Sequence, residues 1–239
     1  TIRGRALGAS HPHVGISLHN LGALLLENGR LEEAALAFER ALSLMRSRLR
    51  PRDPDLAVCL AGVAAMRKTQ GRYSEAADDL RQALVIRQET LSETHPDAAP
   101  CLNALGDVYR ELGEYDKARE LCEQALAVAR ELLGQDHFAT AAILNNLGLL
   151  NKTQGQLASA EALYRQALAI EKRVLGPRHP SLVATLNNLA VVCLSQRRLV
   201  DAEDLLRQAL SICHEKLPAH HPDAGLVMVN LAEVCRLSG

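Results

Sequence analysis

A dipeptide of the His-Pro type returns every 42 residues along this chain, without one insertion or deletion between its copies. The copies are His11-Pro12, Asp53-Pro54, His95-Pro96, His137-Phe138, His179-Pro180 and His221-Pro222. Self-similarity at a fixed period of about 20–50 residues is the signature of a repeat array. The period therefore predicts a row of similar structural units. It also moves the functional question from a single pocket to the surface that the units share.

Each unit is predicted to contain two antiparallel helices, as the fourth unit illustrates. Leu144, Leu147 and Leu150 are spaced for one face of a first helix. The apolar stripe of a second helix consists of Ala160, Leu163, Tyr164, Ala167, Leu168 and Ile170. Neither helix can bury its stripe alone, so we expect the units to stack and to share a core.

The ends of the helices have recognisable signals. Gly155 suits a left-handed cap at the end of the first helix, and Arg197 takes that position in the fifth unit, where we expect strain. The other equivalent residues are Gly29, Gly71, Gly113 and Gly239. At the helix start, Asp53 is a good N-cap, whereas histidine is a poorer one.

Alanine recurs at two positions of the second helix, which predicts a close approach between helices there. One row is Ala34, Ala76, Ala118, Ala160 and Ala202. The other row is Ala41, Ala83, Ala125, Ala167 and Ala209.

These positions resemble the tetratricopeptide repeat. The small residue of that motif's first helix matches Gly22, Ala64, Gly106, Gly148, Ala190 and Ala232. Its alanine–aromatic–alanine spacing matches Ala34/Phe38/Ala41 and Ala160/Tyr164/Ala167, although the motif's tryptophan is Leu or Met here and its terminal proline is absent. The 42-residue period and phrases such as Thr185-Leu-Asn-Asn-Leu-Ala190 are similar to the kinesin light chain type of this repeat. The resemblance implies an all-α, right-handed superhelical solenoid whose first helices line a concave groove.

The 42-residue period also divides the chain into predicted segments, all of which belong to one solenoid domain. Residues 1–10 are expected to end the second helix of a preceding repeat, and 221–239 to form the first helix of a truncated sixth repeat. The five full repeats are expected at 11–52, 53–94, 95–136, 137–178 and 179–220. We therefore expect the chain to be a fragment of a longer protein.

Composition and motifs exclude several classes of function. A formal net charge of −1 argues against a nucleic-acid binder. The absence of long apolar stretches argues against insertion into a membrane. Nucleotide-binding loops and hydrolase or metalloprotease motifs are missing, so we expect neither an enzyme nor a cofactor.

The cysteines and histidines are expected to be structural. Cys59 and Cys101 share one repeat position, and Cys193 and Cys235 share another, which suggests buried thiols in a reducing, cytoplasmic setting. A zinc site could be considered at three histidines of successive repeats, His95, His137 and His179. Stacking should separate successive repeats by about 10–20 Å, however, which is too far for these side chains to bind one zinc ion.

Asparagine recurs at two adjacent positions that the resemblance places on the groove. Asparagine is a poor residue inside a helix, so its recurrence calls for an explanation. One explanation is a ladder of amides that holds the backbone of an extended peptide, and the other is that the amides bridge neighbouring helices of the stack. The residues are Asn103, Asn145, Asn146, Asn187, Asn188 and Asn230.

Basic and apolar side chains complete the predicted peptide-binding site. Lys68, Arg110 and Lys152 occur once per repeat and are expected to select acidic residues of a ligand, as the kinesin light chain resemblance also implies. The alternative is ordinary solvated charge, offset by Asp107 and Glu111. Leu149 and Val191 are expected to receive an apolar anchor.

The sequence thus predicts an adaptor-like module that binds a protein or an acidic peptide. Two alternatives remain open: self-association through apolar ends at Leu7 and Leu231–Leu237, and a regulatory arm of a larger multidomain protein.

Overall fold

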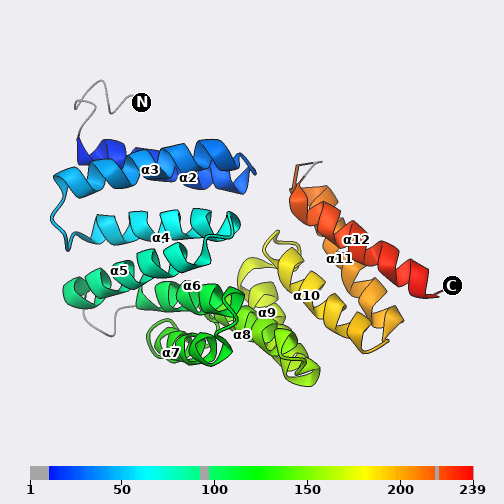
Figure 1. Cartoon of the computed structure of the whole chain (residues 1–239). Helices are drawn as coiled ribbons and strands as arrows, with labels where there is room; N and C mark the ends of the chain where they lie inside the picture. The colour runs from blue at the N-terminus through cyan, green and yellow to red at the C-terminus, as the bar shows by residue number, and fades with distance from the viewer. Residues whose placement is uncertain (1–10, 92–96, 219–220, 239) are drawn as a thin grey trace. The chain divides into compact units, whose positions relative to one another are not determined.

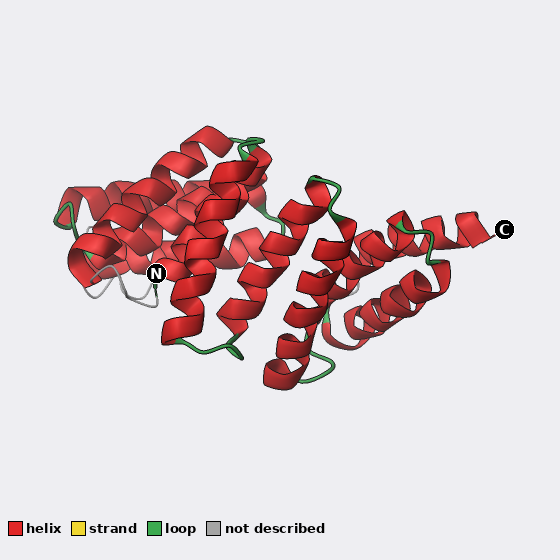
Figure 2. Ribbon diagram, turned by 90° about the horizontal axis from the view of Figure 1, so that it is seen from below, coloured by secondary structure: helices red, strands yellow, loops and turns green. Residues whose placement is uncertain are grey.

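The computed structural model describes residues 11–91, 97–218 and 221–238, and all regular structure in that part of the chain is helical (Figures 1 and 2). The helices are α2 (Pro12–Glu27), α3 (Leu31–Arg48), α4 (Pro54–Thr69), α5 (Tyr73–Leu91), α6 (Ala98–Glu111), α7 (Tyr115–Leu132), α8 (Phe138–Thr153), α9 (Leu157–Leu175), α10 (Leu182–Ser195), α11 (Leu199–Lys216) and α12 (Pro222–Ser238). The predicted all-α class is confirmed.

The chain forms two compact units, residues 1–128 and 129–239, and each is described by itself. In the first unit α2 packs on α3 and α4 on α5, while α3 contacts α4 and α5 contacts α6 (Figure 1). The second unit repeats the scheme, with α8 on α9, α10 on α11, and α10 and α12 each against the preceding second helix. First helices also meet directly, α2 with α4 in one unit and α10 with α8 and α12 in the other.

Both units have an apolar core that follows the repeat phase. Phe38, Leu60 and Leu80 lie in the core of the first unit, and Tyr164, Leu186 and Leu206 in that of the second. All ten alanines of the two predicted rows are buried, so the expectation of close helix approach is confirmed. The repeat boundaries stay a prediction, and residues 1–10 lie outside the described residues.

Side-chain size is matched across each helix pair at the small position of the first helix. A Cβ on Gly22 would lie 3.0 Å from the Phe38 ring, and one on Gly106 would lie 2.6 Å from the sulfur of Cys122. Where the second helix carries leucine instead, the small residue is alanine, as in Ala64 with Leu80 and Ala190 with Leu206. The glycines therefore make room for particular neighbours.

The turns between paired helices confirm the predicted caps. Gly29, Gly71, Gly113 and Gly155 all have positive φ, between 71° and 78°. Arg197 has φ of 62° in the equivalent turn and is the single non-glycine residue with positive φ in the described part of the chain. This conformation disfavours any side chain with a Cβ, so the expected strain at Arg197 has a structural basis.

Histidine side chains cap several of the first helices through a ring nitrogen. The Nδ1 atom of His137 accepts a hydrogen bond from the backbone N–H of Ala139 at 3.1 Å, as the Asp53 carboxylate does from Asp55 at 3.0 Å. His11 and His221 make the same contact two residues ahead, whereas His179 accepts from the N–H of Ser181, the residue before α10 begins. An unprotonated ring nitrogen can thus replace the usual oxygen of an N-cap.

A recurring ion pair joins the last residue of one predicted repeat to the second helix of the next, 37 residues further on. In two junctions the arginine comes first, and in a third the polarity is reversed. The pairs are Arg52–Glu89 at 3.0 Å, Arg178–Glu215 at 3.3 Å and the reversed pair Asp136–Arg173.

The structure also shows the burial of the cysteines and the length and apolarity of the helices. Of the six cysteines, all free, five are buried and Cys235 is exposed. Among the helices that the structure describes, none combines the length and the apolarity needed to cross a bilayer.

Candidate functional site

The candidate site residues lie on the first helices of each unit. We call the accessible side of these helices the first-helix face of that unit: α4 and α6 in the first unit, and α8, α10 and α12 in the second. In the second unit, asparagines bridge neighbouring first helices. Asn188 on α10 donates from Nδ2 to Oδ1 of Asn145 on α8 at 3.3 Å. Asn230 on α12 donates in the same way to Asn187 on α10 at 2.7 Å.

These bridges provide the stacking contact that the second explanation of the asparagines required. The bridges do not occupy every hydrogen-bonding group of these asparagines, because each side-chain amide offers both a donor and an acceptor. The Asn145–Asn188 bridge does not involve the Nδ2 hydrogens of Asn145 or the side-chain carbonyl oxygen of Asn188. Both side chains are half-buried. Asn187, in contrast, is only 5% exposed and is the least accessible of the set.

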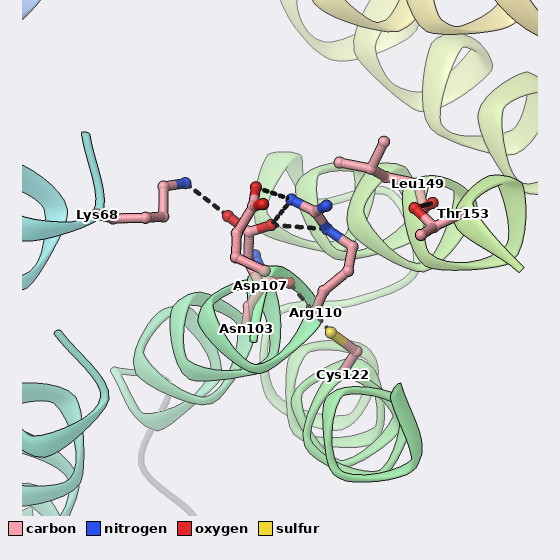
Figure 3. Close-up of polar contacts among 8 residues, drawn as sticks. Lys68, Asn103, Asp107, Arg110, Cys122, Leu149 and Thr153 are labelled. Atoms are coloured by element: carbon pink, nitrogen blue, oxygen red, sulfur yellow. Dashed lines mark hydrogen bonds and ion pairs between the residues drawn. The ribbon is translucent and has the colours of Figure 1, made fainter. Parts of the chain in front are cut away.

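Two further asparagines of the predicted set lie on α6 and α8. Asn103 on α6 accepts from the thiol of Cys122 on α7 at 3.9 Å, so its side chain is turned toward its own helix pair (Figure 3). Asn146 is half-buried on α8. The two bridges described above, Asn145–Asn188 and Asn187–Asn230, both lie within the second unit.

The predicted positive stripe is ion-paired in the first unit. Lys68 at the end of α4 reaches Asp107 on α6 at 2.6 Å (Figure 3). Arg110 contacts the other oxygen of Asp107 at 2.8 Å and Glu111 at 2.5 Å. Two positive and two negative groups therefore meet, which matches the alternative that Asp107 and Glu111 offset the stripe.

Asp107 is the centre of this network. Burial alone would raise the pKa of its carboxyl, but Lys68 and Arg110 together hold the pKa below its usual value. The pKa of Arg110 is raised in turn, because the charge and hydrogen bonds of Asp107 outweigh burial. At neutral pH both groups are charged, and a ligand carboxylate arriving at Lys68 or Arg110 has to compete with Asp107.

The remaining predicted site residues lie on the second unit. Lys152 is half-buried near the end of α8. Leu149 and Val191, the expected apolar anchors, are also half-buried, on α8 and α10. Their backbone carbonyls accept the hydroxyls of Thr153 and Ser195, each at 2.9 Å.

One buried polar contact was not expected from the sequence. Glu171 on α9 is 4% exposed, and its Oε1 accepts from the hydroxyl of Thr185 on α10 at 3.1 Å. Its Oε2 has no hydrogen-bond partner among the residues that the structure describes, and burial raises the pKa of this carboxyl to about 7. The repeat phase carried a partial signal, since at equivalent positions Met45, Ala129 and Cys213 are buried, whereas Arg87 is half-buried.

Two predictions concern other kinds of site. Within the described ranges, no three metal-ligating side chains gather into a group.

Of the apolar ends proposed for self-association, Leu7 lies outside the described residues, while Leu231 and Leu237 are half-buried. Self-association stays a prediction, and light scattering over a range of concentrations would test it.

Comparison with known proteins identifies the repeat. A family model described as tetratricopeptide repeat matches residues 1–47, 55–126, 102–172, 153–215 and 183–239. No curated protein matches the chain.

Solved structures show the same architecture. BtubC (BKLC) from P. vanneervenii is similar over 87% of this chain and 84% of its own, with 27% identity and a TM-score of 0.71. A putative kinesin light chain with nearly identical TPR-like repeats, from Podosopora anserina, matches over 86% of this chain and 98% of its own, with 27% identity and a TM-score of 0.63. PilF of Pseudomonas aeruginosa, at 18% identity and a TM-score of 0.57, shares the fold.

Proposed function

Because the chain belongs to the tetratricopeptide repeat family, whose fold generally serves protein–protein interaction, we propose that it binds an extended segment of a partner protein along its first-helix face. Tetratricopeptide proteins are generally scaffolds without catalysis, and an adaptor role fits that pattern. The likeness to a putative kinesin light chain supports an adaptor that recognises peptide segments.

The amide bridge between Asn145 and Asn188 is the observation that carries the proposal. An extended peptide needs both a donor and an acceptor for each backbone amide it presents. The bridge holds the two side chains in place and leaves one donor and one acceptor over. Fixing them beforehand lowers the entropy that a ligand must lose on binding.

The apolar and charged parts of the proposal follow from the surroundings. Leu149 and Val191 offer half-buried apolar surface on the same two helices, suited to one apolar side chain of the ligand. We propose that Lys152, half-buried near the end of α8, is a basic contact for an acidic residue of the ligand in this unit. Lys68 and Arg110 contribute less, because Asp107 already pairs with both.

The test uses Asn145→Asp, which keeps the oxygen that accepts from Asn188 but removes the donor left for a ligand. Fluorescence polarisation would measure the binding of short labelled peptides that carry one aromatic residue, in an acidic version and in a version with glutamine in place of glutamate. We expect affinity for the glutamine version to fall about tenfold, a loss of about 1.4 kcal/mol, with helicity and thermal midpoint nearly unchanged.

Asn20→Asp is the matched control, because Asn20 lies at the position equivalent to Asn188 and is exposed on α2. It makes the same change of charge outside the second unit and should leave affinity unchanged. Unaltered binding by the Asn145 variant would contradict the proposal, and so would a loss of affinity that only follows a loss of fold. In the latter case the amides serve stacking alone.

A further inference from the structure

Four arginines crowd the junction between α3 and α4. Arg46 and Arg48 lie in the last turn of α3, and Arg50 and Arg52 follow in the loop that ends at Asp53. All four side chains are exposed. In a chain with a net charge of −1, this is a strong local concentration of positive charge.

The charges of the cluster are only partly compensated. Arg52 pairs with Glu89 at 3.0 Å, and Arg46 contacts the neutral amide of Gln82 at 3.4 Å. Arg48 and Arg50 form no ion pair with any residue that the structure describes. Two guanidinium groups are therefore presented to solvent without a protein counter-charge.

The local backbone also favours a binding surface. Arg50, Pro51, Arg52, Asp53 and Pro54 line a hollow of about 560 Å³. The two prolines fix their own φ angles and so restrict the loop before any ligand arrives. The carboxylate of Asp53 is already engaged, because it caps α4 by accepting the N–H of Asp55 at 3.0 Å.

We infer that this arginine loop, Arg46 to Arg52, is a docking surface for an acidic segment of a partner protein. The guanidinium group binds carboxylates in a two-pronged geometry, which suits a run of Glu or Asp side chains. The inference rests on the proposed function and deepens it, since it gives the acidic part of a ligand a place other than Lys68 and Arg110.

The two basic regions are well separated, so they can be tested independently. The arginine loop precedes the first residue of α4, and Lys68 lies in its last turn. With about 1.5 Å of rise per residue, the 16-residue helix places them about 20–24 Å apart. A nucleic acid is the less favoured ligand, because binders of that class carry a basic excess over the whole domain.

The experiment compares Arg48→Glu/Arg50→Glu with the matched control Arg40→Glu/Arg81→Glu. The control changes the charge by the same amount at two exposed arginines of α3 and α5. The probes are a labelled glutamate-rich peptide and its glutamine counterpart, measured by fluorescence polarisation at low and moderate salt. Circular dichroism would check that each variant keeps its helicity.

We expect the loop variant to lose about tenfold in affinity for the glutamate-rich peptide, and the control to lose less than about twofold. The loss should shrink as salt rises, because screening weakens exposed charges. Affinity for the glutamine peptide should stay unchanged in both variants. Equal losses in the two variants, or wild-type protein that binds both peptides alike, would overturn the inference.

Competition separates the other anionic ligands. Single-stranded RNA or phosphatidylserine vesicles that bind the wild type more tightly than the glutamate-rich peptide would also overturn it. Failure of the proposed function looks different, because the wild type would then bind neither peptide. Failure of the inference alone would leave the acidic preference intact in the Arg48/Arg50 variant.

Discussion

A Cβ atom on Gly148 would lie 2.7 Å from the ring of Tyr164, closer than side-chain carbons approach one another. Tyr164 is fully buried, so the ring has no room to withdraw. The equivalent pairs are Ala64 with Leu80 in the second repeat and Ala190 with Leu206 in the fifth. In both pairs the first helix carries one methyl group more, and the second helix carries leucine in place of the aromatic ring. The two positions therefore determine each other's size.

Gly148→Ala should lower the free energy of unfolding by about 1–3 kcal/mol, because it overpacks a filled core. The same substitution made in a Tyr164→Leu background should cost much less, since it recreates the combination of the second repeat. Urea unfolding of the two single variants and the double variant gives the coupling between the sites. Costs that add to within about 0.5 kcal/mol would show that the residues do not compete for space.

Arg197→Gly should raise the free energy of unfolding by about 1 kcal/mol, because it relieves a positive φ at a residue with a Cβ. The reciprocal change, Gly155→Ala, should lower it by a similar amount. A Cβ on Gly155 would meet nothing within 4 Å, so this cost comes from the backbone alone. Chemical denaturation checks both, and a neutral Arg197 variant would argue that the turn is not strained.

Glu171→Gln should stabilise the protein at high pH. The folded pKa of about 7 lies above the ordinary value of 4.5. The protonated carboxyl therefore adds stability that is fully present below about pH 4.5 and is lost as pH rises through about 7. At pH 8 the glutamine variant should be more stable by on the order of 2–3 kcal/mol, as measured by thermal and urea unfolding.

The pH series carries its own control. Glu123→Gln removes an exposed carboxyl from α7 and should leave the curve of stability against pH unchanged. Glu171→Gln should flatten the curve between about pH 4.5 and 7. Two parallel curves for the wild type and the Glu171 variant would contradict a titrating carboxyl at the contact between α9 and α10.

Asp107→Asn should release Lys68 and Arg110 and so increase affinity for an acidic peptide several-fold, about three- to tenfold. It should also cost about 1–3 kcal/mol of stability, because two partly buried cations lose their partner. Since the folded pKa of Asp107 is depressed, that contribution is present at neutral pH and is lost as pH falls. Asp78→Asn, which breaks only the exposed pair with Arg81, should change neither property appreciably.

Much of the fold could be predicted because each unit repeats its chemistry at the same phase. Ala160 and Ala167 were placed at a close helix contact, and both are fully buried. Gly155 and Arg197 were assigned to one turn position, and their φ angles agree. Five superimposed copies turn a weak local signal into a strong one.

The site was harder to predict, because its contacts join different repeats. Lys68 and Asp107 are 39 residues apart, and nothing in either helix alone shows that they meet. The bridge from Asn188 to Asn145 spans 43 residues and depends on how neighbouring first helices are offset. Periodicity gives the face on which a side chain lies, but stacking decides which partner it finds.

The reversed ion pair between Asp136 and Arg173 bears on how such a chain can change length. If the predicted fourth repeat, residues 137–178, were deleted, Asp136 would stand opposite Glu215. If it were duplicated, Arg178 would stand opposite a second copy of Arg173. Each exposed pair contributes only about 0–1 kcal/mol, yet the penalties have the same sign for loss and for gain. In this chain, both loss and duplication of the fourth repeat would therefore bring like charges together at a junction where the present order pairs opposite charges.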